Sequence, residues 1–187
     1  MKIVSENFKD LRALYVNQLR TLLSAEEQMV RALPDMANAA RDEELQQAFR
    51  SHYQETEEHV KRLEELLVHI KGVDPSVTST SPIKCKAAHA LIAEAEDMMQ
   101  DARDAFVKDA ALIAAAQRVE HYEIAVYGAV RQFARLLGES AGAELLDKTI
   151  KEEGHADHLL TSIAERINVD ALHRKNAGEA KGARTAA

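Results

Sequence analysis

Apolar residues recur every three or four positions along this chain, in five separate stretches. This spacing is typical of helices that bury one face. The stretches cover residues 5–40, 42–70, 81–102, 104–137 and 140–167. Residues 72–80 are polar and contain glycine and proline, which indicates a loop. The last residues are rich in lysine, arginine, glycine and alanine, so we expect one folded domain over 1–170 and a disordered tail over 171–187.

Capping and helix-breaking residues place the ends of these helices. Ser5 and Asp42 are suitable N-caps for the first and second helices. Ser81 and the proline after it favour a helix start at that point, and Gly138 ends the fourth helix. Pro34 should kink the first helix without ending it, because the apolar period continues to residue 40.

The lengths of the connections predict the topology. Short turns join the first helix to the second and the fourth to the fifth, so each pair should form an antiparallel hairpin. The long middle segment, which carries the additional shorter helix at 81–102, joins the two hairpins. The sequence therefore predicts an all-α fold, a ferritin-like four-helix bundle with a long crossover.

Acidic residues interrupt the apolar stripes of the four long helices. They are Glu26, Glu55, Glu120 with Glu123, and Glu153. An unpaired buried carboxylate is costly, and several together also repel one another. A bound cation removes both costs, so the pattern predicts a metal site inside the bundle.

Further ligands are expected one helical turn from these acids, because residues three or four apart share a helix face. His59 follows Glu55 by four residues, and Asp157 follows Glu153 by four. A second register on the fifth helix, Glu152 with His155, has the Glu-x-x-His spacing of di-iron bundles. The apolar stripe favours Glu153 and Asp157.

Other polar residues near the stripes have simpler interpretations. His52 is expected to pack in the core or to support a ligand, and His121 to lie off the stripe. Tyr15 and Tyr127 are expected in the core. Cys85 is expected to act as a small buried apolar residue.

The composition narrows the function classes. The net charge is −7, which does not favour a nucleic-acid partner. A single cysteine excludes an internal disulfide and a cysteine-based zinc site, and it favours a reducing compartment. We find no apolar run that predicts a signal peptide or a membrane span.

One stretch of the sequence is highly distinctive. It is DAALIAAAQRVEHYEIA at 109–125, and it occurs together with SAE at 24–26, ET at 55–56 and KC at 84–85. With these segments the chain resembles the YciE/YciF family of ferritin-like bacterial stress proteins. The resemblance implies a four-helix bundle with a metal centre like that of rubrerythrin, a homodimer and a cytoplasmic location. It matches the five inward glutamates to the acids of the family. Two residues depart from the usual di-iron pattern: His59 lies four residues after Glu55 instead of three, and the fifth helix offers Asp157 instead of an inward histidine.

The leading functional hypothesis is a metal-dependent redox protein. Two iron ions, with manganese as the alternative, would be held between the helices, and Fe(II) would be oxidised by peroxide or dioxygen. Glu55 and Glu153 are the expected bridges. The full predicted ligand set is Glu26, Glu55, His59, Glu120, Glu123, Glu153 and Asp157. The alternative hypothesis is a structural or interaction protein, a dimer of bundles in which the metal stabilises the fold without catalysis.

Overall fold

The computed structural model describes residues 8–70 and 81–185, and it describes side chains as far as residue 173. The described residues form five α-helices and no strand, so the expected all-α class is confirmed. The helices are α1 (Leu11–Ala39), α2 (Glu43–His69), α3 (Lys86–Asp101), α4 (Ala105–Leu136) and α5 (Ser140–Thr185). The expected polar loop at 72–80 lies outside the described residues.

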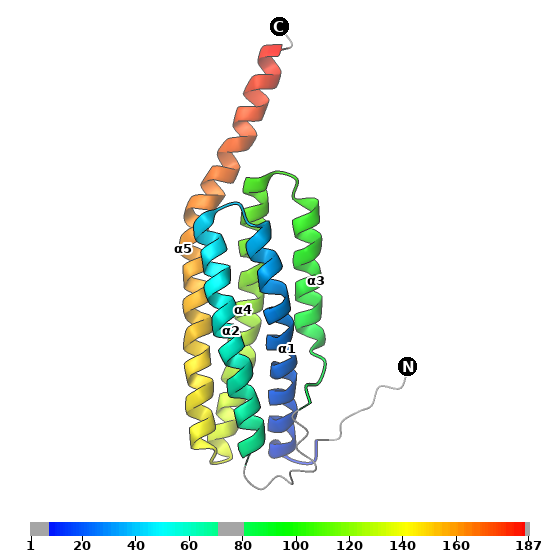
Figure 1. Cartoon of the computed structure of the whole chain (residues 1–187), viewed down its shortest axis with the longest axis vertical. Helices are drawn as coiled ribbons and strands as arrows, with labels where there is room; N and C mark the ends of the chain where they lie inside the picture. Colours follow the sequence, from blue (N-terminus) through cyan, green and yellow to red (C-terminus); the bar gives the residue numbers. More distant parts are fainter. Residues whose placement is uncertain (1–7, 71–80, 186–187) are drawn as a thin grey trace, which may run out of the picture.

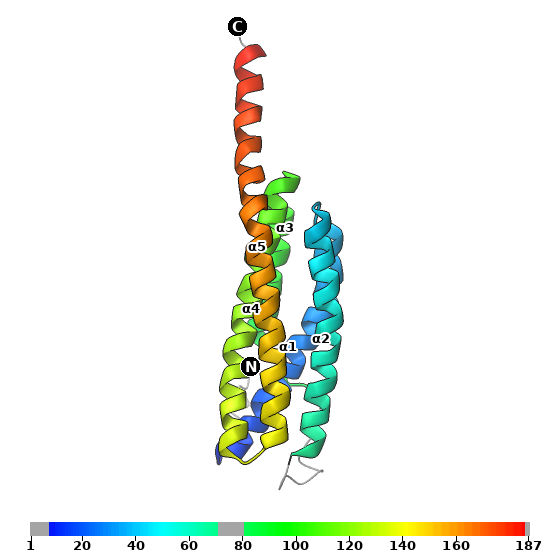
Figure 2. The same ribbon diagram turned by 90° about the vertical axis from the view of Figure 1, so that its left-hand side faces the viewer.

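Helices α1, α2, α4 and α5 form a four-helix bundle, and α3 packs outside it against α1 and α4 (Figure 1). The most extensive packing joins α1 to α2 and α4 to α5, as expected for two antiparallel hairpins (Figure 2). Helix α3 runs along the bundle, so that α4 begins at the end opposite the one where α2 stops (Figure 1). The predicted bundle with a helical crossover is confirmed.

Two helices begin later than the sequence indicates. The expected N-cap of the first helix, Ser5, lies outside the described residues, and α1 begins at Leu11. Asp10 caps α1, because its side chain accepts a hydrogen bond from the Ala13 backbone N at 2.8 Å.

The predicted start of the third helix at residue 81 is wrong, because α3 begins at Lys86. The backbone N of Ile83 donates to the Arg20 carbonyl at 3.0 Å, and Arg20 Nε donates to the Ser81 carbonyl at 2.8 Å. This segment is therefore bound to α1 instead of forming a helical turn. Cys85, which is buried, is the N-cap of α3.

Several other expected ends are confirmed, whereas α5 continues beyond the expected end at residue 167. Asp42 caps α2 as expected, and the fourth helix begins after residue 104, where the Asp104 side chain is the cap. Helix α1 continues through Pro34 to Ala39. Gly138 has a φ of 73°, the left-handed region in which glycine commonly ends a helix.

Helix α5 extends beyond the rest of the bundle. Its backbone is helical to Thr185, and its final part rises past the ends of the other helices (Figures 1 and 2). Side chains after residue 173 lie outside the described set. The expected division into a domain at 1–170 and a disordered tail at 171–187 stays a prediction.

The interior of the bundle consists of two apolar clusters. One cluster, toward the α1–α2 turn, includes Met29, Phe49 and Leu160. The other, toward the α4–α5 turn, includes Tyr15 and Tyr127, so both tyrosines lie in the core as expected. On every helix of the bundle the residues between the two clusters include buried polar or charged side chains. We call this central band the polar layer, and its charged or titratable members are Glu26, His52, His59, Glu120, Glu123 and Glu153.

Asp109 joins the α1–α2 turn to α4. Its side chain is buried and accepts hydrogen bonds from the backbone N of Arg41 at 2.8 Å and of Asp42 at 3.1 Å. Replacing Asp109 with alanine leaves both donors without this partner, so we expect Asp109→Ala to lower the free energy of unfolding by roughly 2 to 4 kcal/mol. Urea unfolding of the full chain measures the loss.

Asp97→Ala is the control for this prediction. Asp97 is exposed on α3, so its removal should change the free energy of unfolding by less than about 0.5 kcal/mol. Equal urea midpoints for the Asp97 and Asp109 variants would contradict the anchoring role.

Candidate metal centre

Six buried side chains that offer metal-ligand atoms meet in the polar layer. Four helices supply them, and an apolar cluster lies on either side of the layer along the bundle. Such a band of charge in a bundle core requires compensation. The residues are Glu26 on α1, His52 and His59 on α2, Glu120 and Glu123 on α4, and Glu153 on α5.

Glu26, His59 and Glu153 form one group with the spacing of a metal site. Each offers one ligand atom, and these atoms lie within 4.8 Å of one another. His59 Nδ1 lies 2.9 Å from Glu153 Oε1 and 3.5 Å from Glu26 Oε2. Three converging side chains from three helices are the minimum that a buried ion needs for a defined position.

His52, Glu120 and Glu153 form a second group of the same kind. His52 Nε2 lies 3.2 Å from Glu120 Oε1 and 3.6 Å from Glu153 Oε2. Glu153 thus turns one oxygen toward each group. A carboxylate shared in this way is suited to bridge two neighbouring ions.

The polar layer is short of hydrogen-bond partners. Among the residues that the structure describes, the buried atoms without one include Glu26 Oε2, His59 Nδ1, Glu120 Oε2, Glu123 Oε1 and both Glu153 oxygens. Even the 2.9 Å approach of His59 to Glu153 lacks hydrogen-bond geometry. An unpartnered buried polar atom normally costs about 1 to 3 kcal/mol, and more when charged. The donor set therefore fits bound cations.

Protons take the place of cations when the layer holds no metal. Burial raises the pKa of Glu153 from 4.5 to about 8. Burial, together with the charges of Glu26 and Glu153, also raises the pKa of Glu123 well above its usual value. Burial lowers the pKa of His59, but the neighbouring carboxylates outweigh it and raise that pKa to about 10. Glu153 and His59 therefore carry protons at neutral pH, and a bound ion would displace them.

Neighbouring side chains orient the candidate ligands. The Tyr127 hydroxyl donates a hydrogen bond to Glu26 Oε1. On the outer side of His59, Nε2 lies 3.1 Å from Glu152 Oε2, and Arg62 donates to both oxygens of Glu152. This pairing turns His59 Nδ1 toward the layer. A carboxylate behind the distal nitrogen is common in metal-bound histidines.

Five of the seven predicted ligands come together in the polar layer, and two lie outside it. Glu55 is 36% exposed, with Oε2 at 3.5 Å from His52 Nδ1. Asp157 Oδ1 accepts a hydrogen bond from Gln117 at 3.1 Å and lies 3.3 Å from exposed His121. Neither Glu55 nor Asp157 belongs to the two groups, which favours a smaller ligand set than the one expected.

His52 is the member of the layer that the sequence interpretation placed in a supporting role. It precedes His59 by seven residues, which is about two helical turns and puts both rings on one face. That spacing was a usable signal. Glu152 has a supporting role that the sequence did not reveal, since it depends on the lateral contact of α5 with α2. Of the two registers considered for the fifth helix, the one with Glu153 inward is the one observed, because Glu153 is buried and His155 is exposed.

The sequence pattern of the family described as a domain of unknown function, DUF892, matches residues 10–173. This chain belongs to the DUF892 family. It is 39% identical to protein YciF of Escherichia coli over 158 residues, which are 84% of this chain and 92% of that protein. The resemblance to the YciE/YciF family is therefore confirmed.

Solved structures support the same assignment. The E. coli stress protein YciF matches this DUF892 chain with a TM-score of 0.80 and 37% identity, over 86% of this chain and 98% of that one. YcfI of Rhodopseudomonas palustris, whose description suggests a structural role, matches with a TM-score of 0.77 and 34% identity, over 84% of this chain and 96% of that one. A third structure, the Xanthomonas campestris protein XCC3681, supports the fold alone. It matches with a TM-score of 0.67 and 20% identity, over 89% of this chain and 99% of that one.

The structure also bears on the expected absence of a membrane span. In the described part of this DUF892 chain, no helix combines the length and the apolar character that crossing a bilayer demands.

Proposed function

We propose that this DUF892 chain is a ferritin-like carboxylate metalloprotein that holds two iron ions, with manganese as the alternative, and oxidises Fe(II) with peroxide or dioxygen in a stress response. The observation that carries the proposal is the set of buried, unpartnered carboxylate oxygens in the polar layer. A core that keeps such atoms without a cation would lose stability and gain nothing.

Charge balance supports two divalent ions. The layer contains four carboxylates, and two ions of charge +2 neutralise them when both histidines are neutral. Four glutamates and two histidines are also the ligand inventory of di-iron carboxylate bundles. Here the histidines both come from α2, and α4 supplies two acids at i and i+3 instead. The inventory agrees, while its distribution over the helices differs.

The two groups suggest which residues would hold each ion. Glu26 and His59 would serve one position, His52 and Glu120 the other, and Glu153 would lie between them. Oxygen-rich ligands of this kind suit iron and manganese. Bound ions would supply Lewis-acid and one-electron redox chemistry. Carboxylates favour the higher oxidation state, so the ligand set favours loss of electrons from iron.

The remaining residues of the layer position and shield these ligands. Tyr127 holds Glu26, and the Arg62–Glu152 pair holds His59, so neither ligand is free to turn away. The two apolar clusters cover the layer at both ends along the bundle. Ligands that are held rigidly bind ions in a defined geometry.

The biological context in the proposal derives from the relatives. The E. coli relative is described as a stress protein. The expected homodimer, the cytoplasmic location and the absence of a nucleic-acid partner stay predictions. The single cysteine provides no rubredoxin-like centre, so electrons to reduce the site again would come from another molecule.

The test combines a metal count with an iron-oxidation assay. Elemental analysis of protein purified without added metal should give two transition ions per chain. Fe(II) oxidation with peroxide or dioxygen should exceed that in buffer, and Glu120→Gln should slow it by roughly tenfold or more while circular dichroism stays helical. Glu144→Gln, at an exposed position on α5, is the control. A rate no higher than in buffer would refute the redox function.

The second candidate function is a metal-stabilised structural protein. It is favoured by the position of the polar layer between the two apolar clusters, where bound ions would tie all four bundle helices together. This hypothesis also predicts two ions per chain. It differs in predicting no iron oxidation above buffer, so the same assay separates the two functions.

A further inference from the structure

A small cavity lies between α2 and α5, beside the polar layer. Its volume is about 60 Å³, and its walls include both surface residues and members of the layer. Ser51 and His155 are exposed at its outer side, and Glu55 is partly exposed there. Buried His52 and Glu120 line its inner side. The cavity therefore extends from the protein surface to the candidate ligands.

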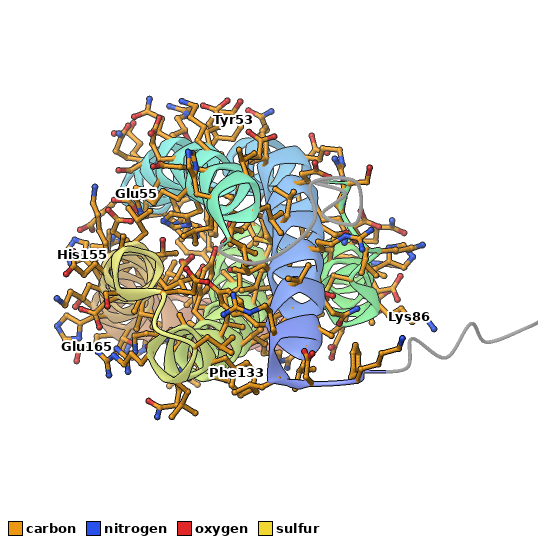
Figure 3. All side chains as sticks on the ribbon, turned by 90° about the horizontal axis from the view of Figure 1, so that it is seen from below. Tyr53, Glu55, Lys86, Phe133, His155 and Glu165 are labelled. Atoms are coloured by element: carbon orange, nitrogen blue, oxygen red, sulfur yellow. The ribbon has the colours of Figure 1, made fainter. Side chains whose placement is uncertain are left out.

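Figure 3 shows two of the residues that line this cavity, seen from the end of the bundle. Glu55 on α2 and His155 on α5 lie at the same side of the molecule, on neighbouring helices. The volume is enough for a few water molecules or one small ion with part of its hydration shell. It is too small for an organic cofactor.

Ligand-type atoms continue inward from this opening in short steps. Glu55 Oε2 lies 3.5 Å from His52 Nδ1. The opposite nitrogen of the same ring lies 3.2 Å from Glu120 Oε1 and 3.6 Å from Glu153 Oε2. His52 thus stands between a carboxylate that reaches solvent and two that do not. Oxygen and nitrogen atoms at such spacing can replace the water ligands of an entering cation one at a time.

A second cavity provides a comparison. It lies among α1, α3 and α4, has a volume of about 70 Å³, and is lined mainly by apolar residues such as Met29, Ile92 and Val119. No member of the polar layer lines it. The two cavities are nearly equal in size, so they differ mainly in the chemistry of the residues that line them.

We propose that the cavity between α2 and α5 is the entrance through which divalent cations reach the polar layer, with Glu55 as the first carboxylate that they meet. This inference rests on the proposed metal site. It assigns Glu55 to the capture of the ion, whereas the sequence predicted a bridging ligand. The ion then passes His52 and reaches Glu120 and Glu153.

Blocking the cavity tests the entrance directly. Ala156 is a buried residue in its wall, and Ala95 is a buried residue in the wall of the other cavity. We expect Ala156→Leu to slow the association of Co²⁺ with the metal-free chain by about tenfold or more, because entry then needs a movement of α5. Ala95→Leu should stay within about twofold of the wild type. Stopped-flow absorbance of bound Co²⁺ measures the rate, and its amplitude should show two ions in each protein.

Charge at the mouth gives a second test that leaves the core intact. Ser51 is exposed, so either lysine or glutamate is accommodated there. We expect Ser51→Lys to slow Co²⁺ association by roughly threefold and Ser51→Glu to accelerate it, with both effects shrinking in high salt. The same two changes at Ser162, which is exposed on α5 and does not line the cavity, should have little effect.

The outcomes separate the entrance from the metal site itself. Equal association rates in all variants, with two ions bound, would overturn the entrance and leave the metal site standing. Failure of the wild-type chain to bind Co²⁺ would overturn both. If Ala156→Leu does not fold, the Ser51 pair decides the question alone.

Discussion

The Glu153→Gln variant should bind transition metal at least about 100-fold more weakly than the unmodified chain, and it should lose both ions together. Loss of a residue that only orients a ligand typically costs 10- to 100-fold in affinity, and Glu153 faces both candidate positions. A glutamine amide has one weak oxygen ligand and no charge to offer. Titration of the metal-free protein with Mn²⁺ or Co²⁺ measures both the affinity and the stoichiometry.

The same substitution should have the opposite effect on the metal-free protein. Burial raises the pKa of Glu153 to about 8, against 4.5 in an unfolded chain. The folded state therefore binds the proton more tightly, and the unmodified protein loses stability as the pH rises from about 4.5 to 8. Glutamine does not titrate. We expect metal-free Glu153→Gln to be more stable than the unmodified chain by roughly 1 to 3 kcal/mol near pH 7.

The control for both measurements is Glu165→Gln, an exposed position on the same helix (Figure 3). It should leave the metal affinity and the metal-free stability nearly unchanged. A Glu153→Gln protein that still binds two ions at the original affinity would show that Glu153 is not shared between them. A Glu153→Gln protein that is less stable without metal would show that the carboxylate is compensated by protein groups alone.

Removal of metal should lower the melting temperature by about 10 °C or more. Ligand that binds only the folded state at 1,000 times its dissociation constant adds about 4 kcal/mol per site. For a chain of this size, each kcal/mol corresponds to roughly 2 to 4 °C. In addition, the metal-free layer leaves several of its carboxylate oxygens unpartnered. Calorimetry of the full chain before and after treatment with a chelator measures the difference.

Readdition experiments control for damage by the chelator. Mn²⁺ or Fe²⁺ should restore the original melting temperature, whereas Mg²⁺ at the same concentration should restore little of it, since that ion gives up its water ligands reluctantly. This result is expected for both the redox and the structural function. An unchanged melting temperature in the chelated protein, with its metal shown to be gone, would contradict both.

The fold followed from local signals for most of its length. Apolar periodicity located all five helices, and short-range chemistry placed some of their ends: Asp42 as a cap and Gly138 as a stop. The prediction that the third helix starts at Ser81 failed, because a long-range interaction holds this segment in a non-helical conformation. Arg20 on α1 binds the backbone of residues 81–83, and no local pattern in that segment reveals such a partner.

The candidate site was predictable in part. A glutamate within an apolar stripe is unusual enough to be recognised from the sequence, and this applies to Glu26, Glu120 and Glu153. Glu55 was harder to place, because Thr56 beside it competes for the inward direction and is the buried one. Asp157 occupies a helical position one turn from Glu153, but its side chain interacts with Gln117 near the surface.

The sequence by itself determined that four long helices would enclose several acids, because the period of apolar residues and the cost of burying charge are local properties of the chain. Only the tertiary structure decided which side chains meet. It turned His52 and His59 toward Glu120, Glu153 and Glu26, and it set Glu152 behind His59. Such meetings depend on the rotation and lateral spacing of neighbouring helices. A shift of one position around a helix moves a side chain by about 100°, enough to exchange a ligand for a surface residue.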